Sequence, residues 1–240
     1  MSTTDLLTDR TILVTGANRG LGKALVDQAL ERGARRVYAG ARQPFTHPDS
    51  RVTPLLLDVT DAAHVEAAAK AVDDLDVLAN NAGQAAYGDL GDRAVLEQQL
   101  AVNLFGPYAV TQAFLPSLIR SRGVVVNVLS LAALASVPVM PAYSVSKAAA
   151  LSLTQGLRAL LGAHGVRVHA VLAGPLDTDM TRDLDIPKAP PAEVAQAIFD
   201  SVNAGEDDIF PDPLSATMAA DWPNGAIKML ERQNAALSAD

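Results

Sequence analysis

Short apolar runs alternate with amphipathic segments along most of the chain. The apolar runs, each predicted to contain a β-strand, are Thr11–Thr15, Arg36–Arg42, Val52–Asp58, Asp76–Gly83, Gly123–Ser130, Gly165–Ala173 and Asp207–Phe210. Helical patterns cover Leu21–Glu31, Asp61–Val72, Val95–Leu118, Tyr143–Leu161 and Pro191–Val202. Strands that are apolar on both faces are typical of a parallel sheet with helices on both sides. The pattern therefore predicts an α/β fold with a doubly wound parallel sheet.

Two stretches depart from this alternation. Gly106 and Pro107 interrupt the longest helical pattern, which predicts either a kink or a join between two helices. The tail over residues 211–240 has a less regular pattern. Because no linker, low-complexity segment or repeat divides the chain, we expect a single domain over residues 1–240, with its core at about 10–210.

Composition excludes several classes of protein. The formal net charge of −8 argues against a nucleic-acid partner, because phosphate backbones attract basic surfaces. The chain has no cysteine, and its four histidines lack the spacing of ligands, so we expect neither disulfides nor a metal site. No apolar run reaches the roughly 18 residues of a membrane span, and the polar, acidic first ten residues do not resemble a signal peptide. We expect a cytoplasmic protein without a membrane partner.

A glycine-rich segment, TGANRGLG, joins the first predicted strand to the first predicted helix. Gly16, Gly20 and Gly22 allow a phosphate to approach the backbone, where a Cβ would collide with it. The N-terminus of the helix that follows supplies free N–H groups and a favourable dipole. The segment therefore predicts a dinucleotide site, whereas the alternative is a tight turn with close helix packing.

Two arginines indicate which dinucleotide is bound. Arg19 precedes Gly20, and Arg42 ends the second predicted strand, where an acid usually meets a free ribose 2′-hydroxyl. No Asp or Glu occurs between Gly33 and Pro48. Because guanidinium groups pair with phosphate, the arginines favour NADP over NAD; the alternative is two solvated surface arginines. Asp58 ends the third predicted strand and is either a contact of the adenine amino group or a turn residue or helix cap.

A second group of residues has the character of a catalytic site. Tyr143 and Lys147 are four positions apart at the start of a helix, so they share a face. A nearby ammonium lowers the pKa of a phenol, which suits Tyr143 to general acid–base catalysis. Ser130 ends an apolar strand, and Asn103 is a polar residue in an apolar helical segment. The alternatives are an ordinary helix pair and an asparagine that satisfies a helix kink.

Together these segments resemble the short-chain dehydrogenase/reductase family, in its compact single-domain, NADPH-preferring, carbonyl reductase-like branch. TGANRGLG, NNAG (Asn80 to Gly83), Asn103, Ser130 and YSVSK stand in the family's order and spacing, over roughly residues 10–205. The resemblance implies a Rossmann fold and NAD(P)-dependent carbonyl and alcohol chemistry. It also implies that the tail over residues 211–240 covers the substrate site or a subunit interface.

The resemblance implies a role for each of the four catalytic candidates. Tyr143 would protonate a carbonyl oxygen, and Ser130 would orient and polarise it. Lys147 would bind the nicotinamide ribose and lower the pKa of Tyr143, while Asn103 would hold a water of a proton relay. The residues expected to bind NADP(H) are Gly16, Asn18, Arg19, Gly20, Leu21, Gly22, Arg42, Asp58, Val59, Asn81, Ala82, Gly83, Tyr143, Lys147, Pro175, Leu176 and Thr178.

By the same resemblance, a largely apolar set of residues would line the substrate pocket. The set is Gln84, Tyr87, Leu131, Val137, Met140, Leu176, Met180 and Leu184, of which the apolar members could equally be core residues. An uncharged ketone or aldehyde is therefore expected rather than a keto acid. The segment Met180–Leu184 is a candidate lid.

The chain departs from the family pattern at several points. Ala173 stands where the family usually has proline, which we expect to loosen the loop that seats the nicotinamide, and Leu129 stands where relatives often have serine. The C-terminal segment differs from that of acyl-carrier-protein reductases. The sequence predicts an NADPH-dependent carbonyl reductase, or ketoreductase, that is a homodimer or homotetramer through its two long helices. The alternative is a catalytically silent NADP-binding regulatory module.

Overall fold

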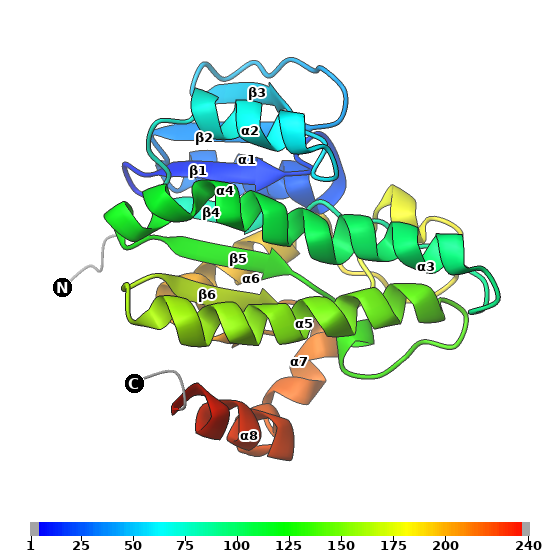
Figure 1. Ribbon diagram of the computed structural model, residues 1–240. Helices are drawn as coiled ribbons and strands as arrows, with labels where there is room; N and C mark the ends of the chain where they lie inside the picture. The colour runs from blue at the N-terminus through cyan, green and yellow to red at the C-terminus, as the bar shows by residue number, and fades with distance from the viewer. Residues whose placement is uncertain (1–4, 237–240) are drawn as a thin grey trace.

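A seven-stranded parallel sheet forms the centre of the computed structural model, which describes residues 5–236 (Figure 1). The strands are β1 (Thr11–Thr15), β2 (Arg36–Ala41), β3 (Val52–Leu56), β4 (Val77–Asn80), β5 (Val124–Val128), β6 (Arg167–Val171) and β7 (Asp208–Ile209). Their order in space is β3-β2-β1-β4-β5-β6-β7, and every neighbouring pair is parallel. The predicted α/β fold class, a Rossmann-like doubly wound sheet, is confirmed.

Helices cover both faces of the sheet. They are α1 (Gly20–Glu31), α2 (Ala62–Ala71), α3 (Arg93–Leu100), α4 (Gly106–Ser121), α5 (Pro141–Gly162), α6 (Pro191–Ala204), α7 (Pro213–Ala219) and α8 (Ala226–Ala235). Figure 1 shows α2, α4 and α5 in front of the sheet and α1 and α6 behind it. Among residues 5–236, no helix is long and apolar enough to cross a membrane.

The apolar core consists of layers above and below the sheet. Alternate residues of β1 face opposite layers: Ile12 and Val14 pack with α1 and α6, whereas Leu13 packs with α2, α4 and α5. All three side chains are fully buried. This burial on both faces is why the strands read as continuous apolar runs rather than as alternating ones.

The predicted interruption at Gly106 and Pro107 is a join between two helical segments, because α4 begins at Gly106. A π-helical segment, Ala101–Phe105, connects α3 to α4 without a break. Pro107 lies in the first turn of α4, where its missing N–H is tolerated. Gly106 lies close to the loop after β3, because an added Cβ would be 2.6 Å from Cγ2 of Val59.

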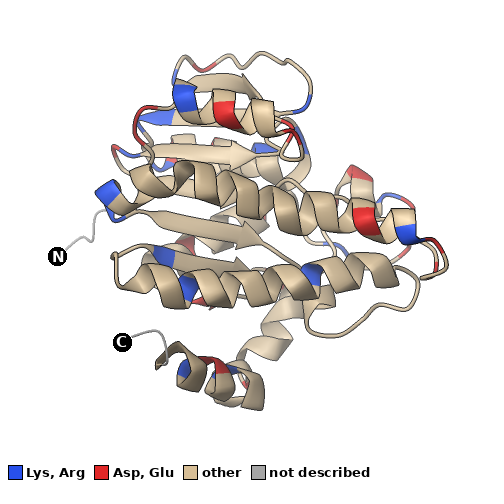
Figure 2. Cartoon of the chain, viewed as in Figure 1, with Lys and Arg blue, Asp and Glu red and all other residues tan. Residues whose placement is uncertain are grey.

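The tail contains more regular structure than its sequence pattern predicts. Over the described residues it forms α7 and α8, and residues 237–240 of the predicted tail lie outside them. Helix α8 is attached by charged groups rather than by an apolar stripe (Figure 2). Nζ of Lys228 lies 2.7 Å from the Asp208 carboxylate and 3.0 Å from that of Glu231, and Arg158 also pairs with both acids. A hydrophobic pattern cannot reveal such an attachment.

The sheet has its topological switch point between β1 and β4, since the chain runs from β1 to β2 and β3 on one side and from β4 to β5, β6 and β7 on the other. Ligands of open parallel sheets bind beyond the carboxyl ends of the strands at such a point. The segments that follow β1, β4, β5 and β6 meet there, on the right in Figure 1.

Candidate active site

The glycine-rich segment forms a tight turn between β1 and α1. Gly16 and Gly20 have φ angles of +65° and +52°, a region that favours glycine. A Cβ on Gly22 would lie 2.0 Å from the carbonyl oxygen of Gly16, so glycine is required where α1 packs on the turn. Within residues 5–236, no side chain accepts a hydrogen bond from the first-turn N–H groups of α1. These groups can bind an anion.

The loop after β4 is attached directly to this turn. Oγ1 of Thr15 accepts hydrogen bonds from the backbone N–H groups of Asn81 (3.0 Å) and Ala82 (2.9 Å). Nδ2 of Asn81 donates to the carbonyl oxygens of Thr15 (2.9 Å) and Gly16 (3.2 Å). The Asn81 side chain therefore holds the two loops together, and the structure brings together Gly16, Asn81 and Ala82, three predicted cofactor residues.

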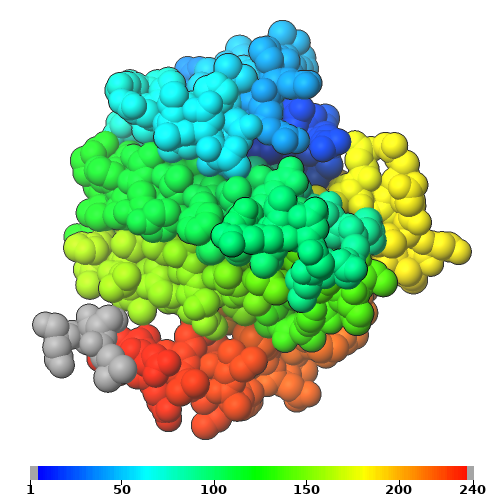
Figure 3. Space-filling model, turned by 45° about the vertical axis from the view of Figure 1, so that its right-hand side comes forward, coloured from blue at the N-terminus to red at the C-terminus, as the bar shows by residue number. Residues whose placement is uncertain are grey.

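A cleft of about 340 Å³ lies beside the glycine-rich turn. Its walls are Gly20 on one side and a segment after β6 on the other, and the lining residues are Gly20, Asp177, Thr178, Asp179, Arg182 and Lys188. Figure 3 shows this segment, in yellow, standing out from the surface. Gly20 and Thr178 were predicted from the sequence. Arg182 and Lys188 were missed, and their only signal is two cations in a loop that follows a strand end.

The two predicted phosphate ligands differ in their surroundings. Nη1 of Arg19 lies 3.0 Å from Oδ2 of Asp179, so this arginine bridges the glycine-rich turn and the far wall of the cleft. Arg42 is exposed to solvent, near Asp58. The structure therefore leaves Arg42 accessible to a ligand and gives Arg19 a carboxylate partner.

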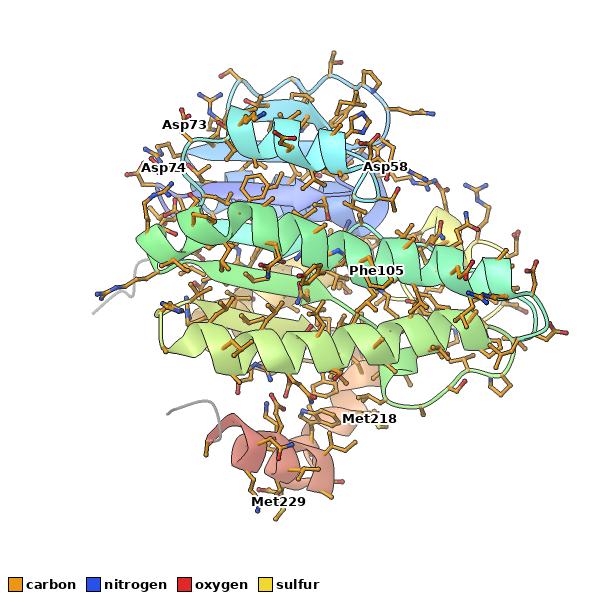
Figure 4. The ribbon with its side chains drawn as sticks, in the orientation of Figure 1. Asp58, Asp73, Asp74, Phe105, Met218 and Met229 are labelled. Atoms are coloured by element: carbon orange, nitrogen blue, oxygen red, sulfur yellow. The ribbon has the colours of Figure 1, made fainter. Side chains whose placement is uncertain are left out.

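Asp58 forms a turn at the carboxyl end of the strands (Figure 4). Its Oδ1 accepts hydrogen bonds from the backbone N–H (2.9 Å) and the hydroxyl (2.7 Å) of Thr60. Partial burial raises the pKa of Asp58, but the bonds from Thr60 and the charge of Arg42 outweigh it, and the pKa is lowered. The prediction that Asp58 is a turn residue is confirmed, whereas its contact with the adenine amino group stays a prediction.

Ser130 and Tyr143 lie together at the carboxyl end of β5. Ser130 follows β5, and Tyr143 lies in the first turn of α5. Burial raises the pKa of Tyr143 above its usual value of 10.0, and a hydrogen bond with Ser130 partly offsets this rise. The pKa of Tyr143 is therefore raised, whereas the sequence predicts that it is lowered. The reason is that burial outweighs the interactions that stabilise the phenolate in this structure.

Lys147 lies one helical turn further along α5. Its Nζ donates a hydrogen bond to the carbonyl oxygen of Val128 (2.9 Å) and lies 5.7 Å from the centre of the Tyr143 ring. The side chain of this lysine is almost fully buried, and burial lowers its pKa from 10.5 to about 8. A Cβ on Gly83 would be 3.7 Å from this ammonium, so the loop after β4 packs close to the Lys147 side chain.

Asn103 lies in the π-helical segment and is 1% exposed. Its Oδ1 accepts a hydrogen bond from the N–H of Gln84 (3.0 Å), and its Nδ2 donates to the carbonyl oxygen of Gln84 (2.9 Å) and to Oγ of Ser146 (2.9 Å). The amide thus joins the loop after β4 to α5. None of these bonds goes to the backbone of the irregular helix, so they do not support the alternative of an asparagine that satisfies a helix kink, and the water-holding role stays a prediction.

The residues predicted to line the substrate pocket come from three segments around Ser130. They follow β4 (Gln84 and Tyr87), β5 (Leu131, Val137 and Met140) and β6 (Leu176, Met180 and Leu184). Tyr87 and Met180 are exposed, and none of the eight lines the cleft beside Gly20. The pocket they would form therefore stays a prediction. Within the described part of the chain, no three His, Asp or Glu side chains are grouped so that they could hold a metal ion.

Comparison with known proteins identifies the family. Residues 10–188 match the family model of the short chain dehydrogenases. The chain is 37% identical to the short chain dehydrogenase pigC of Monascus ruber and 36% identical to tazN of Aspergillus terreus, over 72% of its own length in each case. These matches span 65% and 42% of the two relatives.

A solved structure is also similar over nearly its whole length. It is a short chain dehydrogenase from Burkholderia cenocepacia in complex with NADP, and it is 36% identical to this chain with a TM-score of 0.86. The alignment covers 95% of this chain and 98% of the other. The chain belongs to the short-chain dehydrogenase/reductase family of oxidoreductases.

Proposed function

We propose that the protein is an NADPH-dependent carbonyl reductase that converts an uncharged ketone or aldehyde to the alcohol, and that also catalyses the reverse oxidation. The observation that carries this proposal is the placement of the Ser130 hydroxyl close to the Tyr143 phenol, with the ammonium of Lys147 beside the Tyr143 ring. The three groups lie at the carboxyl ends of the strands, next to the glycine-rich turn. A proton donor, a carbonyl-orienting hydroxyl and a fixed cation are the groups that carbonyl reduction needs.

The residues of the glycine-rich turn fit a dinucleotide phosphate. The first-turn N–H groups of α1 are free of side-chain partners among the described residues, and a cleft opens beside Gly20. Arg42 is exposed where the 2′-phosphate of NADP would lie, and the similar Burkholderia cenocepacia structure contains NADP. The other residues proposed for the cofactor are those named from the sequence. When bound, NADPH supplies the hydride for the reduction.

Tyr143 supplies the proton. Because burial raises its pKa, the phenol is fully protonated near neutral pH and can donate its proton to the carbonyl oxygen. The hydroxyl of Ser130 donates a hydrogen bond to the same oxygen and orients it. As negative charge develops on the Tyr143 oxygen, the Lys147 ammonium, 5.7 Å from the centre of the ring, stabilises it. Lys147 would also hold the nicotinamide ribose.

The substrate class follows from the side chains around Ser130. Leu131, Val137 and Met140 offer apolar surface, which suits an uncharged carbonyl compound. The cations Arg182 and Lys188 line the cleft beside Gly20, which none of these three residues lines, and Arg182 is paired with Asp179. We further propose that the protein is a homodimer or homotetramer.

The second candidate is a catalytically silent NADP-binding module. The family match and the glycine-rich turn are as consistent with this module as with the reductase. The two candidates are separated by measuring NADPH binding and ketone-dependent NADPH oxidation on the same preparation. Binding with turnover supports the reductase. Tight binding without turnover, over a panel of aryl and aliphatic ketones and aldehydes, supports the module.

A further inference from the structure

A buried carboxylate outside the catalytic group lies at the start of α7. Asp212 is 5% exposed and is the N-cap of this helix. Its Oδ1 accepts a hydrogen bond from the backbone N–H of Ser215 (3.0 Å), and its Oδ2 accepts one from the Ser215 hydroxyl (2.7 Å). The first of these bonds and a bond from the Asp212 backbone N–H to Oγ of Ser215 (3.1 Å) form a capping box. Ser215 therefore accounts for the contacts on one side of the carboxylate.

The other side of Asp212 reaches the loop after β6. Its Oδ2 also accepts a hydrogen bond of 2.7 Å from the backbone N–H of Gly174. A Cβ on Gly174 would lie 2.7 Å from Oδ1 of Asp212, so this close approach requires glycine. The bond joins the C-terminal segment to a loop 38 positions earlier in the chain.

The same peptide group is held at its opposite end. The carbonyl oxygen of Ala173 accepts a hydrogen bond of 2.9 Å from the N–H of Leu131, the residue after Ser130. Asp212, the Ala173–Gly174 peptide and Leu131 thus form a continuous chain of hydrogen bonds that ends beside Ser130. A peptide group that is bonded at both its N–H and its C=O cannot rotate without losing both bonds.

This arrangement bears on the position where proline was expected from the sequence. Ala173 leaves the backbone freer than proline would, since it does not fix the φ angle. The bonds from Leu131 and to Asp212 restrain the loop instead. Pro175, Leu176 and Thr178 follow directly, and these are the residues proposed to face the nicotinamide end of the cofactor.

We propose that Asp212 is a positioning residue for the reaction: through Gly174 it fixes the loop that faces the nicotinamide and, through Leu131, the backbone beside Ser130. This inference rests on the proposed function. It assigns to the C-terminal segment a role in the geometry of the catalytic group. The adenine half of the cofactor lies with the glycine-rich turn and would be unaffected.

The test compares Asp212→Ala with Ser215→Ala. Asp212→Ala removes every bond of the carboxylate, whereas Ser215→Ala disrupts the capping box but leaves the Gly174 bond in place. Both variants weaken the cap of α7 and are expected to lower the melting temperature. Four quantities are measured for each: kcat for the best ketone, the Kd of NADPH, the Kd of 2′,5′-ADP, and the hydrogen exchange of the Gly174 and Leu131 amides.

We expect Asp212→Ala to lower kcat by about 10- to 100-fold, because small misplacements of reacting groups have effects of this size. The Kd of 2′,5′-ADP, which probes only the adenine half, should stay within about twofold of the wild-type value. Exchange should rise at Leu131 as well as at Gly174. Ser215→Ala should keep a kcat close to that of the wild type.

Asp212→Asn is the variant to compare if Asp212→Ala does not fold. The carboxamide has the same shape, but one of its two atoms is a donor, so it cannot accept all three bonds. Equal losses of kcat in the Asp212 and Ser215 variants, or a Leu131 amide as protected as in the wild type, would overturn the inference. If the wild type itself consumes no NADPH, the proposed function fails, whereas the exchange of Leu131 still tests the role of Asp212.

Discussion

The ammonium of Lys147 lies 5.7 Å from the centre of the Tyr143 ring, and burial shifts the pKa values of the two side chains in opposite directions. The pKa of Tyr143 is raised above 10.0, and that of Lys147 is lowered to about 8. As pH rises, the lysine therefore loses its proton before the tyrosine does. Below pH 8 the site holds a neutral phenol beside a cation, the state that proton donation requires.

The first prediction is the pH dependence of carbonyl reduction. Because kcat/KM reports the free enzyme, it should be level at neutral pH and should fall as pH rises through about 8, where Lys147 loses its charge. The measurement is a profile of kcat/KM from neutral pH to about 10. Lys147→Arg keeps its charge throughout, so its remaining activity should lack this decline. A wild-type profile that stays level to the upper end would contradict the assignment.

The second prediction concerns the phenol. Tyr143→Phe removes only the hydroxyl, so the Kd of NADPH should remain within about twofold of the wild-type value while kcat falls by about 10²- to 10⁴-fold. Titration of NADPH by its fluorescence and steady-state turnover give the two values. If kcat is retained, another group is the proton donor.

The third prediction is the cofactor preference. Arg42→Asp places a carboxylate where the 2′-phosphate is proposed to lie. The Kd of NADPH should therefore rise by about 10- to 100-fold, while the Kd of NADH should stay unchanged or fall. Arg36→Asp makes the same charge change at the other end of β2, on another exposed side chain, and serves as the control. Unchanged relative affinities for the two cofactors in Arg42→Asp would refute the phosphate assignment.

The fourth prediction follows from the pairing of Arg19 with Asp179. The two charges are 3.0 Å apart and exposed, so a 2′-phosphate that binds Arg19 must compete with a weak ion pair. Asp179→Asn should therefore lower the Kd of NADPH by about two- to fivefold and leave the Kd of NADH unchanged. Asp183→Asn alters the net charge of the same segment and should have no such effect. The gain should disappear in an Arg19→Gln background, and a gain that persists there would show that Arg19 is not responsible.

The fifth prediction is the assembly state. Phe105 in the π-helical segment is 59% exposed, and Leu160 on α5 is 63% exposed. Figure 4 shows Phe105 between α4 and α5 in that view. Light scattering should find a dimer or a tetramer, and Phe105→Glu should shift it toward smaller species, because a buried charge is costly. Leu56→Glu, on the edge strand β3, is the control. A wild-type monomer would refute the assembly.

The fold could be predicted well because its signals are local. Strand β1 has the predicted bounds, Thr11–Thr15, and the alternation of strands and helices predicted the doubly wound parallel sheet. The glycines of that turn carry their own backbone requirement, as the φ angles of Gly16 and Gly20 show. Features of this kind depend on only a few adjacent residues and can therefore be predicted from the sequence.

The features that sequence reasoning missed depend on residues far apart in the chain. Helix α8 is attached through the pairing of Lys228 and Glu231 with Asp208 and Arg158, which no periodicity encodes. The raised pKa of Tyr143 reflects burial, which only the packed structure determines. The Arg19–Asp179 pair and the role of Asp212 likewise need the loops to be placed in space.

The measurement that tests the central claim most directly is ketone- and aldehyde-dependent oxidation of NADPH by the purified protein, followed by absorbance, with NADH in parallel. The account predicts turnover of at least one uncharged substrate with NADPH and much weaker turnover with NADH. Tight NADPH binding without oxidation on any member of the panel would contradict it and would favour a silent binding module.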